Sequence, residues 1–161
     1  MDVSEIRHRL GLTQAQFADL LVVTQPAVAA WEAGRRAPSR QLAIVLDRVA
    51  RCFDGPNRSY GEHRGRPIEL PEERWEAVVV PDHEVTLPTR LDWSPRAGER
   101  DLRDAEQRAG AYAQVLDEGT PADVRFWIDP DELVALWPDV PVARHMRAPV
   151  GELVAALRAH G

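Results

Sequence analysis

Apolar residues in the first third of the chain recur at spacings of three and four, which is the period of an amphipathic helix. Between residues 3 and 53 they form short groups separated by polar and turn-forming residues. This arrangement predicts several closely spaced short helices. The last group predicts one longer helix from Arg40 to Phe53, with an apolar side of Leu42, Val45, Leu46, Val49 and Phe53.

The first of a pair of short helices has a clear start signal. Thr13 is followed three residues later by Gln16, which is the spacing of a capping box, so we expect a helix to begin at Gln14. Its buried side is expected to be Phe17, Ala18 and Leu21. Val22 and Val23 then interrupt the helix.

A second helix is expected after this interruption. Thr24 is its predicted N-cap, and Pro26 lies in its first turn, where the missing N–H of proline costs nothing. The helix is expected to run to about Glu32, and Gly34 is placed to end it. Two short helices joined by a tight turn form a helix-turn-helix.

The two faces of this second helix differ. Val28 and Trp31 are expected to pack on the first helix. The opposite side, called the recognition face below, consists of Gln25, Pro26, Ala29 and Ala30. A helix with this face exposed can enter a major groove, where a glutamine amide pairs with adenine and alanine methyls touch a thymine methyl.

Three arginines follow the second helix and are called the arginine cluster: Arg35, Arg36 and Arg40. Alone they would indicate a solvated basic loop, but their position directly after the helix suits contacts to phosphate oxygens. Backbone N–H groups at the helix starts can add phosphate contacts.

At these residues the sequence resembles the Cro/repressor-type (XRE) helix-turn-helix family. The resemblance extends from Ile6 to Ser39 and rests on Gly11-Leu12-Thr13-Gln14, Phe17-Ala18, Thr24-Gln25, Val28, Trp31-Glu32 and Gly34-Arg35. It implies that Gln14 contacts phosphate and supports Gln25, that the residues after Thr24 read bases, and that Arg7 and Glu32 form an ion pair. The expected DNA-binding residues are Gln14, Thr24, Gln25, Pro26, Ala27, Ala29, Ala30, Arg35, Arg36 and Arg40.

The sequence departs from the family pattern at two places. Val22 stands where the family usually has glycine, and a β-branched residue is poorly suited to a positive φ, so we expect a differently shaped turn. After Ser39 the family usually has two short helices, whereas residues 40–53 predict one longer helix. Because the recognition face is apolar beyond Gln25, DNA shape is expected to contribute to specificity.

The rest of the chain predicts a mostly helical region with a small β element. Residues 54–74 contain repeated Gly and Pro breaks and are interpreted as a linker. Val78–Val80 and Val85–Leu87 predict two short strands joined by a turn. From about residue 97 helices are expected, with an apolar stripe at Leu102, Ala105, Ala109, Tyr112, Ala113 and Leu116, and start signals at Thr120-Pro121, Asp129-Pro130 and Pro149.

The expected fold is therefore mainly α and in two parts. Residues 1–53 form a repressor-type helix-turn-helix bundle, residues 54–74 a linker, and residues 75–161 an acidic, mostly helical interaction or dimerisation domain. The net charge of −6 is unevenly distributed along the chain, because residues 1–66 carry a net charge of +3 and residues 67–161 a net charge of −9. The basic part is expected to meet DNA and the acidic part to meet protein.

Several classes of function find no support in the sequence. No apolar stretch is long enough to span a membrane, and the first residues lack the layout of a signal peptide, so a cytoplasmic chain is expected. Cys52 is interpreted as a core residue. No histidine, cysteine or carboxylate pattern predicts a metal site, a cofactor or a catalytic centre.

The acidic part suggests two kinds of partner. Because one module of this type contacts only a half-site, a homodimer on a palindromic operator is expected. An acidic surface also suits a basic protein partner such as a cognate toxin. Residues 112–121 and 134–137 resemble antitoxin-type regulators paired with nucleotidyltransferase-like toxins.

Two hypotheses of function follow. The first is a sequence-specific transcriptional repressor of double-stranded DNA, in the form of an antitoxin that autoregulates its operon. The alternative is a protein-interaction adaptor whose helix-turn-helix does not read DNA. No constellation of residues in the sequence supports an enzymatic function.

Overall fold

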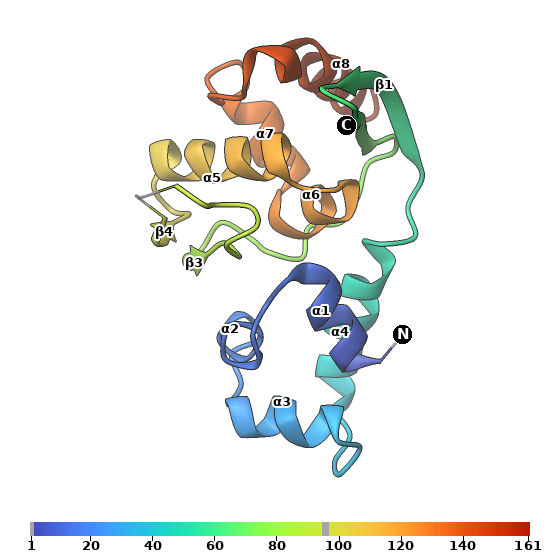
Figure 1. Cartoon of the computed structure of the whole chain (residues 1–161), viewed down its shortest axis with the longest axis vertical. Coiled ribbons are helices and arrows are strands. Elements are labelled where there is room, and N and C mark those ends of the chain that lie inside the picture. Colours follow the sequence, from blue (N-terminus) through green and yellow to red (C-terminus); the bar gives the residue numbers. More distant parts are fainter. Residues whose placement is uncertain (1, 95–96) are drawn as a thin grey trace.

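The computed structural model describes residues 2–94 and 97–161, which form a lower and an upper lobe (Figure 1). The lower lobe contains α1 (Val3–Leu10), α2 (Gln14–Leu20), α3 (Gln25–Glu32) and α4 (Arg40–Arg51). The predicted helix pair and the longer fourth helix are confirmed. The apolar core of this lobe contains Ile6, Leu10, Phe17, Ala18, Val28, Leu46 and Val49.

The interpretation of residues 54–74 as a linker is wrong for most of that segment. β1 (Asn57–His63) and β2 (Arg66–Pro71) pair as an antiparallel hairpin. Its turn, Arg64-Gly65, has φ values of 51° and 74°, the conformation that a two-residue hairpin turn requires. Gly61, at φ 84°, lies where the strand register shifts. These glycines therefore shape a hairpin, which packs on two helices of the upper lobe, α6 and α8.

The predicted pairing between residues 78–80 and 85–87 is also wrong. β3 (Glu84–Thr86) pairs antiparallel with β4 (Glu99–Asp101), which comes later in the sequence. The backbone N–H of Val79 instead donates to the carbonyl of Phe126 at 3.1 Å. The physical reason is that Val79 is buried against the helices, where it finds a partner from another element.

The upper lobe is built mainly from helices, as predicted. They are α5 (Ala105–Glu118), α6 (Pro121–Trp127), α7 (Pro130–Leu136), the short 3-10 helix η1 (Arg144–Met146) and α8 (Arg147–Ala159). The side chains of Asp104, Thr120 and Asp129 accept hydrogen bonds at the starts of α5, α6 and α7. The predicted stripe of α5 is buried except for its first helical residue, Ala105.

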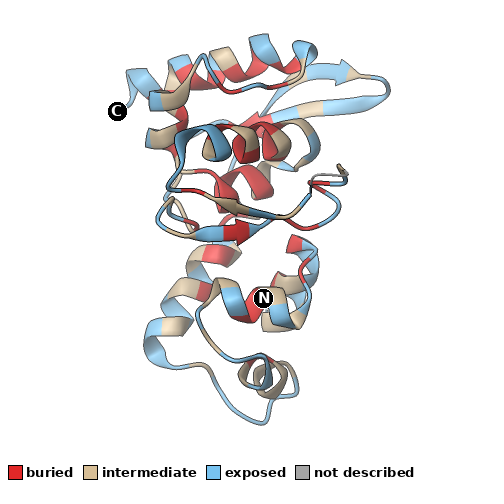
Figure 2. Ribbon diagram, turned by 90° about the vertical axis from the view of Figure 1, so that its left-hand side faces the viewer, coloured by how far each residue is buried: buried red, intermediate tan, exposed pale blue. Residues whose placement is uncertain are grey.

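Buried residues concentrate between the helices of the upper lobe, and the lower lobe has a smaller buried centre (Figure 2). The mainly α class is confirmed. None of the helices in the described part of the chain combines the length and the apolar character needed to cross a bilayer. The lobes meet where the tops of α1 and α4 approach the upper lobe (Figure 1).

Candidate DNA-binding interface

The candidate site is built on α2, α3 and the turn between them. Thr13 Oγ1 accepts a hydrogen bond from the N–H of Gln16 at 3.1 Å, and Gln16 Oε1 accepts one from the N–H of Thr13 at 2.9 Å. Thr24 caps α3 by accepting from the N–H of Ala27 at 3.4 Å. Because these caps satisfy orphan N–H groups, they define where both helices begin.

The turn between the helices does not have the different shape that Val22 led us to expect. Val22 adopts φ 55°, the left-handed conformation that glycine favours. Its N–H donates to the carbonyl of Asp19, and the next N–H, that of Val23, donates to the carbonyl of Ala18. The side chain of Val22 is 91% exposed. The turn therefore keeps a left-handed residue at this position and carries the strain of a β-branched side chain.

A network of polar side chains connects α1, α2 and α3. Arg7 Nε donates to Glu32 Oε1 at 2.6 Å and Arg7 Nη2 to Glu32 Oε2 at 3.1 Å, with both side chains nearly buried. Gln14 Nε2 donates to Glu32 Oε2 at 2.8 Å, and Gln25 Nε2 donates to Gln14 Oε1 at 3.4 Å. The hydrogen bond from Arg7, together with that from Gln14, holds the pKa of Glu32 below its usual value.

The recognition face lies on the outside of α3. Gln25 and Pro26 are exposed, whereas Ala29 and Ala30 are half-buried. Behind them Val28 is completely buried, and Trp31 packs against the core. Of the other expected DNA-binding residues here, the N-cap Thr24 is exposed and Ala27 is half-buried. The exposed surface therefore presents one polar amide followed by small side chains.

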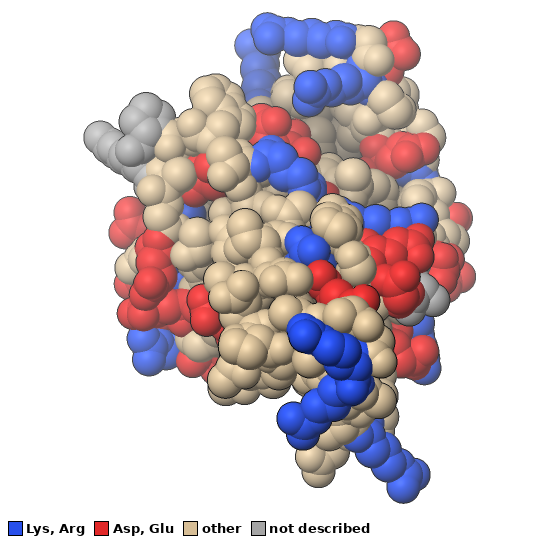
Figure 3. Space-filling model, turned by 60° about the horizontal axis from the view of Figure 1, so that its bottom comes forward, with Lys and Arg blue, Asp and Glu red and all other residues tan. Residues whose placement is uncertain are grey.

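The arginine cluster continues this surface beyond the end of α3. Gly34, at φ 67°, turns the chain there, and all three arginines of the cluster are exposed. None of them forms an ion pair with another described residue. With this end of the molecule brought forward, arginine side chains project from it, and acidic side chains gather at the flanks (Figure 3). The site therefore has a free positive charge beside the recognition face.

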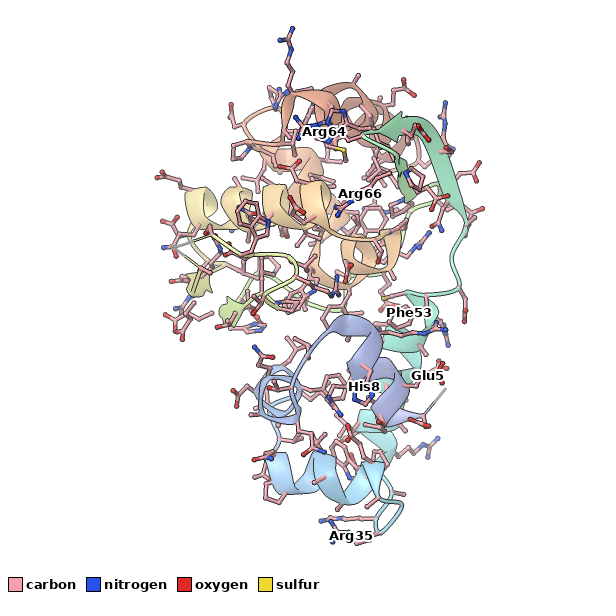
Figure 4. The ribbon with its side chains drawn as sticks, viewed as in Figure 1. Glu5, His8, Arg35, Phe53, Arg64 and Arg66 are labelled. Atoms are coloured by element: carbon pink, nitrogen blue, oxygen red, sulfur yellow. The ribbon has the colours of Figure 1, made fainter. Side chains whose placement is uncertain are left out.

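Not every arginine of the basic segment belongs to this surface. Arg64 and Arg66 lie on the hairpin, at the opposite end of the molecule from Arg35 (Figure 4). The net charge of +3 counted over residues 1–66 thus includes arginines of the upper lobe. The division of charge along the sequence corresponds only in part to the division between lobes.

Other candidate chemistry has structural explanations. Cys52 is buried and its thiol donates to the carbonyl of Arg48, and burial raises the pKa of Cys52 to about 12. Such a thiol is unreactive at neutral pH. Within residues 2–94 and 97–161, no group of three or more histidine, cysteine or carboxylate side chains is arranged to hold a metal.

The residues that join the two lobes could not be identified from the sequence. Arg90 and Arg125, from the upper lobe, donate hydrogen bonds to backbone carbonyls of the lower lobe. Both are single arginines that belong to no recognisable sequence motif. The sequence does have a glycine shortly after each of the two helices, Gly11 after α1 and Gly55 after α4. Each of these glycines lies next to one of the two guanidinium groups.

The comparisons with known proteins agree with the geometry of the lower lobe. Residues 3–52 match the family model described as Helix-turn-helix. No curated protein and no solved structure matches the chain. The match covers α1 to α4, less than half of the chain, and agrees with the helix-turn-helix geometry of the lower lobe.

Proposed function

We propose that this chain, whose residues 3–52 form an XRE-type helix-turn-helix, is a sequence-specific DNA-binding transcriptional regulator. One observation carries the proposal: the exposed amide of Gln25, at the start of α3, is supported by Gln14, which is itself held by Glu32. A side chain that only faced solvent would not need such support. An amide held at the N-terminal end of an exposed helix suits bidentate recognition of adenine.

The other residues take complementary roles in this proposal. Ala29 and Ala30 allow the helix to approach the groove and can contact thymine methyls. The arginine cluster binds phosphates on one side, and N–H groups at the starts of α2 and α3 bind them on the other. Because few side chains reach base edges, sequence-dependent DNA shape contributes to specificity.

Binding of the full chain to the duplex upstream of its own gene tests this proposal. Gln25→Ala is expected to relax base preference, whereas Arg35→Ala weakens binding to all sequences and lowers the salt slope by about one. Arg103→Ala is a matched control, because Arg103 is an exposed arginine of the upper lobe paired with Asp101. Unchanged binding by the Gln25 and Arg35 variants would contradict the proposal.

A finer proposal concerns the upper lobe. We propose that it supplies the contacts of a homodimer on a palindromic operator and binds a basic protein, as expected of an antitoxin that represses its own operon. The net charge of −9 over residues 67–161 and the 70% exposure of Trp93 support a protein-binding role. Copurification with the product of an overlapping toxin-like reading frame tests it. If no complex with that product forms, the antitoxin role is excluded, whereas the proposed DNA binding is not affected.

The alternative, a protein-interaction adaptor, is favoured by one observation. Beyond Gln25 the outer surface of the helix-turn-helix is apolar, and Val22 stands 91% exposed beside it. An apolar surface of this kind also suits a protein partner. Absent or salt-insensitive DNA binding, together with a tight partner complex, would favour the adaptor.

A further inference from the structure

An arginine of the upper lobe binds the end of the first helix. Arg90 Nη2 donates to the carbonyl of Leu10, the last residue of α1, at 2.8 Å. The same guanidinium donates from Nη1 to Asp123 Oδ2 at 2.8 Å and from Nη2 to Asp123 Oδ1 at 2.5 Å. The last carbonyls of a helix have no partner within it, so Arg90 satisfies one of them from the other lobe.

A second arginine does the same at the end of α4. Arg125 Nη1 donates to the carbonyl of Cys52 at 3.2 Å, and Nη2 donates to Asn57 Oδ1 at 2.8 Å and to the carbonyl of Pro56. Arg125 is only 4% exposed and forms no ion pair with a described carboxylate. Burial lowers the pKa of its guanidinium. Burying a charge among neutral acceptors costs free energy and is therefore an inefficient way to stabilise a fold. We therefore interpret Arg125 as a residue that positions α4 relative to the upper lobe.

The backbone is shaped to receive both arginines. A Cβ added to Gly11 would lie 2.6 Å from Arg90 Nε, and one added to Gly55 would lie 2.5 Å from Arg125 Nε. Real Cβ atoms do not approach other atoms so closely. Each guanidinium therefore occupies a place that only glycine leaves open.

Both contacts converge on α6. Asp123, which accepts hydrogen bonds from Arg90, is 1% exposed and also accepts one from the N–H of Thr120 at 2.7 Å. Arg125 lies two residues further along the same helix. One short helix is thereby tied to the ends of both α1 and α4. Because Arg7 of α1 is bound to Glu32 of α3, the orientation of the recognition helix is linked to the upper lobe through side-chain contacts.

We infer that Arg90 and Arg125 are positioning residues that set the distance between half-sites accepted by a dimer of this chain. The inference rests on the proposed function, since it concerns a dimer joined through the upper lobes on DNA. If α6 holds each helix-turn-helix at one angle, the two recognition faces lie at one separation. The second half-site then binds at high effective concentration only when the operator spacing matches that separation.

Binding of the full chain to duplexes with two half-sites, moved apart in single base-pair steps, tests this inference. A single half-site duplex is measured alongside. The wild type is expected to prefer its best spacing over one changed by two base pairs by roughly tenfold or more. Arg90→Lys and Arg125→Lys keep the charge but lose the forked geometry, so each should reduce this preference to about threefold or less. Affinity for the single half-site should not change.

Two further variants keep the test valid if a lysine variant fails to fold. Gly55→Ala displaces the Arg125 guanidinium without altering any charge, and should also broaden the spacing preference. Gly98→Ala is its control, because a Cβ at Gly98 meets nothing within 4 Å. Arg103→Lys is the control for the lysine variants.

The outcomes separate the inference from the proposed function. Folded Arg90 and Arg125 variants that retain the wild-type spacing preference would overturn the inference and leave DNA binding in place. A wild type that binds the half-site yet shows no preferred spacing would overturn it as well. A wild type that binds none of the duplexes would contradict the proposed function itself.

Discussion

Gln14 Nε2 donates a hydrogen bond to Glu32 Oε2 at 2.8 Å, which joins the first residue of α2 to the last residue of α3. This bond orients the Gln14 amide so that its oxygen faces Gln25, whose Nε2 lies 3.4 Å away. Gln25 keeps a second N–H and its own oxygen unused by this contact. These are the donor and acceptor that the N7 and N6 positions of adenine require.

Loss of the Glu32 carboxylate should destabilise the lower lobe. Glu32→Ala leaves the nearly buried Arg7 and the amide of Gln14 without their acceptor, so we expect the free energy of unfolding to fall by about 2 kcal/mol. Chemical denaturation measures this change. Glu5→Ala is the control, since Glu5 pairs with Arg9 on the surface and should change stability by less than about 1 kcal/mol. Equal losses in both variants would contradict the role given to Glu32.

The same carboxylate predicts a dependence of stability on pH. The folded pKa of Glu32 is lowered from 4.5, so its contribution is complete above about pH 4.5 and is lost as the pH falls through the lower, folded pKa. The stability difference between wild type and Glu32→Gln should therefore shrink as the pH falls below about 4.5. Unfolding measured over that range tests this, and a constant difference would exclude the expected coupling.

Val22 should be a site where substitution stabilises the protein. A β-branched residue at φ 55° carries strain of about 1–2 kcal/mol, and its 91% exposed side chain contributes little packing. Val22→Asn is expected to raise the free energy of unfolding by about 1 kcal/mol, because asparagine tolerates this conformation. Val80→Asn replaces another exposed valine, one without a positive φ, and should give no such gain. A destabilised Val22→Asn variant would contradict the strained turn.

Asp117 should limit stability at neutral pH. Burial raises its pKa from 3.8 to about 6, although its carboxylate accepts a hydrogen bond from the N–H of Ala143 at 3.0 Å. Since the folded pKa is the higher one, the stabilising effect is complete below pH 3.8 and is lost as the pH rises through about 6. Asp117→Asn keeps the acceptor and should raise the free energy of unfolding at about pH 8 by on the order of 1 kcal/mol.

Comparison with acidic conditions completes the Asp117 test. At about pH 4 the same substitution should have little effect, because the folded wild type already carries the proton. Glu62→Gln, at an exposed carboxylate on β1 that is not among the groups shifting the pKa of Asp117, should have little effect at either pH. A gain that does not depend on pH would refute the explanation by burial.

The lower lobe could be predicted because its signals are local. Thr13 with Gln16 and Thr24 with Pro26 each place a helix start within a few residues. The shape of the turn could not be predicted, since the hydrogen bonds around Val22 outweigh its preference against positive φ.

The β structure could be predicted only in part, since the strand expected at residues 85–87 overlaps β3 but the hairpin and the strand pairing could not be predicted. Gly61 and Gly65 were interpreted as breaks in a linker, although a bulge and a tight hairpin turn also need glycine. The pairing of β3 with β4 and the stacking of His63 on His145, with ring centroids 3.8 Å apart, join residues remote in sequence. Patterns of local spacing carry no information about such contacts.

Selection of bound sequences from a random pool of duplex DNA by the full chain tests the central claim most directly. The account predicts enrichment of an inverted repeat that contains adenine at the position read by Gln25. Gln25→Ala, which keeps the fold, should lose the preference at that position and keep the rest of the repeat. Failure of the folded wild type to enrich any sequence would contradict the claim that this helix-turn-helix reads DNA.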